Sequence, residues 1–597
     1  MSNRFTYIIA GTLLLIMFLL AIFSIAEDSF TFDETTHTAA GYSYLTQKDM
    51  RLNPEHPPLL KDLATIPLLF LNLNFPKDRP SWIQAEPPQW WAQFDFAFQF
   101  LYHSDNNPDQ ILFWSRMPMI LLLIFLGWFL FKWTRELFGP EGKPSASYGA
   151  SNKAALLALF LFSFSPTFLA HGRLVTTDVG AATGVFIATY YFLKALKNPD
   201  KKNIILAGIS FGLAELCKFS VILLIPLFVF LALVWWLIKL GNLKQAFKIL
   251  ISVFVIGYLL IGLVYQYHVL NYPPERQARD TEFLLASTPF PFLGKILVWA
   301  STKPVFRPLA EYFLGLALVF QRAAGGNTTY FLGEVSAAGW KNYFPVVYSI
   351  KESLAFHILT LIAILYSAGL IKKPFWVNLF PRVENWIKFH FSEFAMICFI
   401  LLYWIVSLNS NLNIGVRHLL PVFPFTILLV SATTISWLKQ PYSKLKYTIF
   451  GVLILWQAIS VISIYPHFLT YFNELVGGPD KGYIYTVDSN LDWGQDLKRL
   501  KKWVDINLPA GRQVYVDYFG GGNAEYYLKE KYAPWWGTRD PQELPKGSYL
   551  AVSATFLQGG RGEPVPGFNQ QYGYYRWLDK YKPVTKIGYS IFVYYIP

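Results

Sequence analysis

Long apolar segments recur along most of the chain, and short polar connections separate them. An apolar run of about 20 residues is long enough to cross a bilayer as a helix. By this length rule the pattern predicts roughly eleven membrane-spanning helices. They are expected at residues 6–26, 117–131, 154–170, 177–196, 204–216, 220–238, 249–269, 350–371, 394–408, 419–438 and 447–465. A re-entrant helix is expected around residues 311–321.

Lysine and arginine gather in alternate connections between these predicted spans, and the positive-inside rule places those connections in the cytoplasm. The opposite set includes residues 27–109, where twelve acidic residues outnumber five basic ones. We therefore expect a multi-pass protein of the cytoplasmic membrane, with a cytoplasmic N-terminus and an extracytoplasmic first loop and C-terminal domain. The basic residues of the cytoplasmic set are Arg4, Lys132, Arg135, Lys143, Lys153, Lys194, Lys197, Lys201, Lys202, Lys239, Lys244, Lys248, Lys372, Lys373, Arg382, Lys388, Lys439, Lys444 and Lys446.

The first predicted span, residues 6–26, is expected to be a retained anchor. Ser24, Ile25 and Ala26 resemble the small-residue cleavage site of a signal peptide. The apolar run is nevertheless longer than the signal-peptide core of about 7–15 residues. An acidic pair follows within a few residues and needs an anchor nearby, which favours retention.

Beyond about residue 475 the chain becomes less apolar and rich in glycine, proline and tyrosine. Residues 513–518 and 549–553 have strand-like patterns, and residues 497–506 have the pattern of a helix with a basic face. The predicted fold is an α-helical polytopic membrane protein with a small C-terminal α/β extracytoplasmic domain. We expect a membrane domain at 1–470, including the first loop at 27–112, and the α/β domain at 475–597.

Composition supports this class and excludes others. Charged residues make up only 15% of the chain, against about 25% in soluble domains. The net charge of +13 arises mainly from the basic connections. A basic stripe with interleaved aromatic residues, which would indicate a nucleic-acid partner, is absent from the sequence. The two cysteines, Cys217 and Cys398, lie in apolar segments, which excludes a disulfide framework or a zinc spacing.

Ionisable residues cluster at the predicted outer ends of the spans, and charges at membrane depth are costly enough to indicate function. Each cluster alone has a simpler explanation, such as a helix cap, a solvated surface, an internal ion pair or a snorkelling interface anchor. Their convergence on one face favours a reaction with an anionic leaving group. The clusters are Asp33 and Glu34 with His37; Glu55, His56, Lys61 and Asp62; Arg173 with Asp178; Glu215 with Lys218; and Lys351 and Glu352 with Arg417 and His418.

These motifs resemble the lipid-carrier-dependent glycosyltransferases of the GT-C superfamily, in particular the protein O-mannosyltransferase and aminoarabinose-transferase-like group. The acidic pair after the first helix is matched by Asp33 and Glu34, and the His-Pro-Pro-Leu-x-Lys motif by residues 56–61. Arg173, Asp178 and Lys218 match the next two family positions, whereas Lys351, Arg417 and His418 match later ones more loosely.

The resemblance covers roughly the first 470 residues and is most specific in the first 220. Residues 488–497 resemble a signature of bacterial members whose sugar is unknown. The β-trefoil insert of eukaryotic protein mannosyltransferases is absent from the sequence, which weakens the case for a protein acceptor. An acceptor glycan, lipid or protein therefore stays open.

The resemblance implies inverting transfer of a sugar from a polyprenyl-phosphate donor in the membrane lipid to an acceptor hydroxyl. Asp33 is the implied general base, and Glu34 would position acceptor or water. The implied phosphate-binding cations are Arg173, Lys218, Lys351 and Arg417. The implied substrate-pocket residues are Glu55, His56, Lys61, Asp178 and His418.

No cofactor is expected. Glu55, His56 and His37 are candidate ligands for a divalent metal, but the resemblance implies a metal-independent reaction. A calcium loop starting at Asp488 is excluded, because Trp493 and Arg499 occupy its sixth and twelfth positions.

Two other function classes stay open. A transporter or lipid-linked sugar flippase is the main alternative, although no paired halves are visible and the charges lie at helix ends rather than at mid-membrane. A structural or assembly protein whose tail binds envelope partners is the other, and it leaves the ionisable clusters without a role.

Overall fold

The computed structural model describes residues 2–83, 90–138, 148–371, 374, 377–439, 443–509 and 511–597. Three of the basic residues expected in the cytoplasm, Lys143, Lys372 and Lys373, lie outside these ranges.

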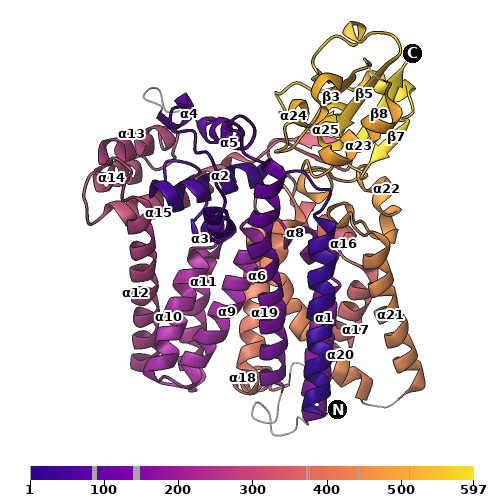
Figure 1. Ribbon diagram of the computed structural model, residues 1–597. Coiled ribbons are helices and arrows are strands. Elements are labelled where there is room, and N and C mark those ends of the chain that lie inside the picture. The colour runs from indigo at the N-terminus through magenta and orange to yellow at the C-terminus, as the bar shows by residue number, and fades with distance from the viewer. Residues whose placement is uncertain are drawn as a thin grey trace.

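A bundle of long apolar helices forms the membrane region (Figure 1). Within the described residues, eight helices are long and apolar enough to cross a bilayer, or nine if a bent pair is one span. The chain is thus a multi-pass helical membrane protein, as predicted. The helices that coincide with the predicted spans are α1 (Asn3–Ser24), α6 (Pro108–Leu137), α7 (Tyr148–Ser163), α9 (Asp178–Lys197), α10 (Lys201–Glu215), α11 (Leu224–Leu237), α12 (Leu243–His268), α17 (Leu354–Gly369), α19 (Phe391–Leu408), α20 (Phe423–Lys439) and α21 (Lys444–Ser463). The count of eleven spans stays a prediction, because α7 and α10 have only 16 and 15 residues.

Two predicted spans are broken near the same end of the bundle. The run at 154–170 divides into α7 and the short α8 (Pro166–His171), where Pro166 occupies the first turn and Ser165 caps the helix. The run at 350–371 begins in α16 (Tyr343–Lys351), which is bent by 112° from α17. Only a few polar residues stand at each break, Ser163 and Ser165 at the first and Lys351, Glu352 and Ser353 at the second, so hydropathy averaged over each run did not reveal them.

Several shorter elements cover one end of the bundle, which we call the site face (Figure 1). The N-terminus and α18 (Leu379–Phe389) lie at the other end. A helix is present at 311–321 as part of α15, whereas its re-entrant course stays a prediction. The elements of the site face are α2 (Phe32–Gln47), α3 (Leu59–Thr65), η1 (Ile66–Phe70), α4 (Pro80–Ile83), α5 (Ala92–Tyr102), α13 (Pro274–Leu284), α14 (Pro291–Ser301), α15 (Arg307–Gly325), β1 (Thr329–Phe331), β2 (Glu334–Ser336), and the 3₁₀ helices η2 (Phe219–Leu223) and η3 (Val416–Val422).

The C-terminal part forms a small α/β domain over the site face (Figure 1), as predicted. Its five-stranded sheet has the order β4-β3-β5-β8-β7. Strand β3 runs parallel to β4 and β5, and β8 runs antiparallel to β5 and β7. The strands are β3 (Val514–Asp517), β4 (Tyr532–Pro534), β5 (Ser548–Ser553), β7 (Thr585–Ile587) and β8 (Ile591–Ile596); the helices are α22 (Pro479–Gly482), α23 (Leu497–Asn507), α24 (Ala524–Leu528) and α25 (Ala554–Arg561).

The two parts of the chain are joined by more than the connecting segment. Strand β6 (Glu563–Pro564) of the C-terminal domain pairs in parallel with β2 of the 271–349 segment. The 3₁₀ helices η4 (Phe468–Thr470), η5 (Glu474–Val476) and η6 (Asp488–Asn490) lead from α21 into the domain. The boundaries 1–470 and 475–597 stay a prediction.

Candidate active site

A cavity of about 930 Å³ opens on the site face and contains the predicted base. Asp33, in the first turn of α2, lines it, and its side chain is 24% exposed. Glu55 and His56 line it from the loop before α3, and Arg322 lines it from α15. Aromatic and apolar side chains cover much of the remaining wall, as is usual for ligand pockets. They include Phe32, Trp90, Trp91, Phe94, Phe283 and Leu318.

A chain of alternating charges leads from the cavity into the protein. Arg417 donates from Nη1 to Asp33 Oδ2 at 3.0 Å and to Asp178 Oδ2 at 3.3 Å. Lys218 Nζ lies 2.5 Å from Asp178 Oδ1. Four residues predicted from separate motifs are therefore linked by ion pairs, and Asp178 lies between two cations at the start of α9.

Glu34 lies next to Asp33 in sequence but belongs to a different environment. Its side chain is fully buried and is not among the residues that line the cavity. Five donors reach its two oxygens. They are Arg116 Nε and Nη2 at 2.8 and 2.6 Å, the Val175 backbone N–H at 2.9 Å, and the Thr31 backbone N–H and hydroxyl at 2.9 and 3.0 Å. This geometry fixes the start of α2 and so positions Asp33, whereas the predicted contact of Glu34 with acceptor or water stays untested.

Arg173 is held at a second buried group of charges. It pairs with Asp28, which also accepts from Arg116 Nη1 and Arg499 Nη1 at 3.0 Å each. Three arginines around one carboxylate hold the pKa of Asp28 well below its usual range despite burial. The group joins α1, α6 and the 172–177 loop to the C-terminal domain. Phosphate binding by Arg173 would require it to leave Asp28.

Two further candidate lysines, Lys351 and Lys61, are buried, and their ammonium groups donate to uncharged oxygens. Lys351 Nζ donates to the carbonyl oxygens of Leu469, Tyr471 and Asn490 at 2.9, 2.6 and 2.5 Å. Lys61 Nζ donates to Tyr44 and to both oxygens of Asn53 at 2.8–3.1 Å. These contacts fix the connecting loops, and phosphate binding by Lys351 stays a prediction that needs a rearrangement.

The remaining candidate residues are three histidines and Glu55. His37 Nδ1 donates to the Val175 carbonyl oxygen at 2.8 Å, and its ring meets the His56 ring edge-on at 5.1 Å. Burial lowers the pKa of His37 to about 4. Its imidazole is therefore neutral at physiological pH and adds no charge to the cavity. Glu55 pairs with Arg322 at 3.1 Å. His418 is not among the residues that line the cavity, and its ring centre lies 6.4 Å from that of Phe344.

Among the described residues, no group of three or more histidine, cysteine, aspartate or glutamate side chains is arranged to hold a metal ion. The candidate set of Glu55, His56 and His37 therefore does not form a recognisable metal centre. The expectation of a cofactor-free reaction stays a prediction.

Sequence reasoning missed Arg116, Asp28 and Arg322. Arg116 directly precedes the predicted span at 117–131, and the helix that contains it, α6, has 30 residues. A charge inside so long an apolar helix was the signal that could have found it. Arg322 follows the predicted helix at 311–321 by one residue, but only the fold brings it to the cavity.

Asp492 gives a prediction for the pH dependence of stability. It is fully buried, accepts from the Thr555 backbone N–H at 2.9 Å, and has one oxygen without a partner. Burial raises its pKa to about 8, so between about pH 4 and 8 the unfolded state releases a proton that the folded state keeps. The contribution of Asp492 to the free energy of unfolding therefore falls as the pH rises from about 4 to 8. In thermal scans from pH 5.5 to 8.5, Asp492→Asn should show a smaller drop in unfolding temperature than wild type; equal drops would contradict the assignment.

Comparison with known families supports the predicted resemblance. Residues 110–261 match the family model described as dolichyl-phosphate-mannose-protein mannosyltransferase. Over these residues the resemblance is confirmed. The matched segment includes Arg116, Arg173, Asp178 and Lys218 and ends before Arg417. No curated protein sequence matches the chain.

Three solved structures are similar at low sequence identity. The apo oligosaccharyltransferase of Archaeoglobus fulgidus is 13% identical with a TM-score of 0.49, over 98% of this chain and 73% of that one. ArnT from Cupriavidus metallidurans bound to undecaprenyl phosphate is 12% identical with a TM-score of 0.30, over 100% and 98%. The S. cerevisiae protein O-mannosyltransferase Pmt1–Pmt2 complex bound to the sugar donor is 17% identical with a TM-score of 0.32, over 45% and 34%.

Proposed function

We propose that the protein is a membrane glycosyltransferase that moves a sugar from a polyprenyl-phosphate carrier to an acceptor hydroxyl, with inversion and without a cofactor. The observation that carries the proposal is the position of Asp33. Its carboxylate lines a large, partly aromatic cavity and lies 3.0 Å from the Arg417 guanidinium. A base near the acceptor and cations near a leaving phosphate are the two groups that such a transfer requires.

Asp33 accepts the proton of the acceptor hydroxyl as that oxygen attacks the anomeric carbon from the side opposite the phosphate. The bond from the anomeric carbon to the phosphate oxygen breaks, and the polyprenyl phosphate leaves with an added negative charge. Arg417 orients the Asp33 carboxylate and adds positive charge behind it. Lys218 and Arg417 together neutralise Asp178, which keeps that buried carboxylate from repelling the donor.

Arg322 is the first cation that a donor phosphate would meet. Among the described residues that line the cavity, it is the only lysine or arginine. Its side chain is 43% exposed, so it can exchange Glu55 for phosphate without unfolding its surroundings. A charge-assisted contact of this kind is worth about 1.5–3 kcal/mol, and partial exposure places Arg322 at the lower end.

The site face is proposed to be extracytoplasmic, because the basic connections lie on the opposite set of loops. The carrier would then reach the cavity from the outer leaflet of the cytoplasmic membrane. The acceptor is a glycan, lipid or protein with a free hydroxyl.

The direct test is a panel of radiolabelled polyprenyl-phosphate sugars incubated with the purified protein in detergent. A glycosyltransferase releases the labelled sugar from the lipid onto an acceptor or water. A transporter or flippase leaves the label on the lipid in detergent and moves it between leaflets only in vesicles. Leaflet movement without release from any donor would favour that alternative.

Replacing Arg322 by alanine should raise the KM for the donor about tenfold, because it removes the proposed phosphate contact. The KM for the acceptor should change little. Initial rates across donor and acceptor concentrations check this, with Arg276→Ala as the control, since that partly buried arginine pairs with Asp280 away from the 930 Å³ cavity. Equal donor KM values for wild type and Arg322→Ala would remove Arg322 from the phosphate site.

A further inference from the structure

The segment at residues 488–495 of the C-terminal domain contacts both sides of the Asp33–Arg417 pair. Ser489 and Trp493 in this segment have exposed fractions of 0% and 1%. Arg417 Nε donates to Ser489 Oγ at 3.1 Å, and its guanidinium carbon lies 4.2 Å from the centre of the Trp493 ring. The cation that meets Asp33 is thus held by two side chains from a different part of the chain.

The same segment fixes the backbone that presents Arg417. The Val416 N–H donates to Asn490 Oδ1 at 2.9 Å, and Ser489 Oγ donates to the Ile414 carbonyl oxygen. The serine hydroxyl therefore uses its one proton on the backbone and a lone pair on Arg417, which satisfies both of its roles. Gly415 has φ of 151°, and a Cβ there would lie 2.2 Å from Ser489 Oγ. The close approach leaves no space for another residue type.

The opposite edge of the segment is bonded to the loop that leads into α2 and Asp33. The Phe32 N–H donates to the Trp493 carbonyl oxygen at 3.0 Å, and the Ser29 N–H donates to the Gln495 carbonyl oxygen at 2.9 Å. Ser29 Oγ also donates to the Gly494 carbonyl oxygen at 2.6 Å. One segment consequently sets the positions of the base and of the cation beside it.

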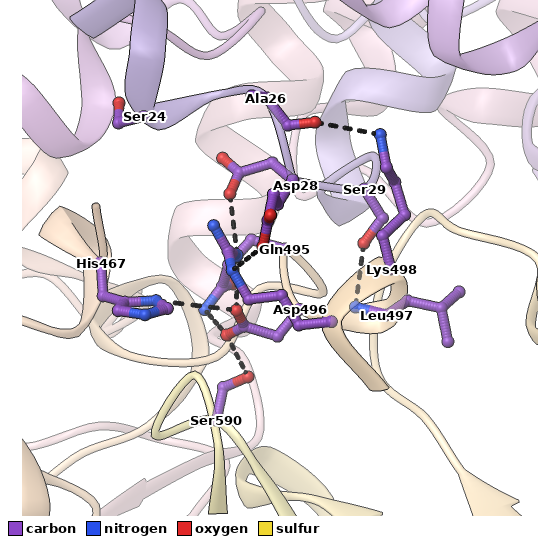
Figure 2. A network of polar contacts seen from close by, with 12 residues as sticks. Ser24, Ala26, Asp28, Ser29, His467, Gln495, Asp496, Leu497, Lys498 and Ser590 are labelled. Atoms are coloured by element: carbon purple, nitrogen blue, oxygen red, sulfur yellow. Dashed lines mark hydrogen bonds and ion pairs between the residues drawn. The ribbon is translucent and has the colours of Figure 1, made fainter. Parts of the chain in front are cut away.

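Ion pairs just beyond the segment secure it to the membrane domain. Arg499 Nη1 bridges Asp28 Oδ1 at 3.0 Å and Asp496 Oδ1 at 2.6 Å. Figure 2 shows Asp28 and Asp496 in this network, with Ser590 donating to Asp496 Oδ2 at 2.7 Å. Arg499 and Asp28 are almost fully buried, so little salt screening is expected.

We infer that residues 488–495 form part of the active site, with Ser489 and Trp493 as positioning residues that aim the Arg417 guanidinium at Asp33 and at the departing phosphate. The inference rests on the proposed function. It gives the C-terminal domain a role in the reaction itself, because this segment contacts both Arg417 and the loop that leads to Asp33. Small displacements of such groups can lower rates by up to about 10²-fold.

The test compares Ser489→Ala with the matched control Ser548→Ala. Both serines are buried in the C-terminal part, and both hydroxyls donate to a backbone carbonyl oxygen, but that of Ser548 donates to Pro545 in the same domain. We expect Ser489→Ala to lower kcat about tenfold with a similar donor KM, and Ser548→Ala to change kcat less than twofold. Both variants should elute from size exclusion like wild type and show similar decreases in unfolding temperature, because each loses a buried hydrogen bond.

A double-mutant cycle with Arg417→Lys separates positioning from a general structural role. Lysine keeps the charge but lacks the Nε–H that Ser489 accepts. If Ser489 acts through Arg417, Ser489→Ala lowers kcat little further in the Arg417→Lys background. An additive loss there, or equal kcat values for Ser489→Ala and Ser548→Ala, would overturn the inference. A wild-type protein that transfers sugar from no polyprenyl-phosphate donor would instead refute the proposed function, and the inference with it.

Discussion

Replacing Asp33 by asparagine is expected to lower sugar transfer by about 10²–10⁴-fold, the usual contribution of a general base. The amide keeps the shape of the carboxylate but accepts no proton at neutral pH. Expression and chromatographic behaviour should not change, because Asp33 is partly exposed in the cavity wall and Arg417 keeps its second partner, Asp178. Single-turnover rates with a labelled polyprenyl-phosphate donor measure the effect.

Asp62→Asn is the matched control for that experiment. Asp62 lies on the same face, has 14% side-chain exposure, and pairs with His268 at 2.9 Å. It should keep transfer within a few-fold of wild type. If Asp33→Asn turned over donor as fast as Asp62→Asn, Asp33 would not be the base.

Replacing Glu34 by glutamine is expected to destabilise the protein by about 3–5 kcal/mol, the cost of breaking a buried charge pair. Five donors converge on the two carboxylate oxygens. A glutamine has one acceptor oxygen and places an NH₂ group against donors at the other position. The charge of Arg116 would also lose one of its two buried partners.

The unfolding temperature in detergent and the monodisperse fraction after purification measure this loss. Glu55→Gln is the control, because among the described residues Glu55 forms an ion pair only with Arg322, whose side chain is 43% exposed. It should unfold near the wild-type temperature. If Glu34→Gln were as stable as Glu55→Gln but inactive, Glu34 would act directly in the reaction instead of stabilising the fold.

The membrane helices were predictable because length and apolarity are local properties of the sequence. Each predicted apolar run coincides with a helix, and the strand patterns at 513–518 and 549–553 coincide with β3 and β5. The breaks before α8 and α17 were not predicted. They depend on the caps Ser165 and Ser353, which are common residues that indicate a helix start only when the chain also bends there.

The site was predictable only in part, for a physical reason. Motifs identified Asp33, Asp178, Lys218 and Arg417, and the structure joins them by ion pairs. The roles of the buried residues depend on partners far away in sequence, such as Asp28 for Arg173, which no local pattern reveals. The segment at 488–495 was visible as a motif, but its contact with Arg417 required the three-dimensional arrangement.

The stereochemistry of the product tests the central claim most directly. One base opposite a leaving phosphate predicts a single displacement, so the anomeric configuration of the product should be the reverse of that in the polyprenyl-phosphate donor. Nuclear magnetic resonance of the product formed by the wild-type protein measures this configuration. An inverted product that disappears with Asp33→Asn is the predicted result, and a retained configuration would contradict the account.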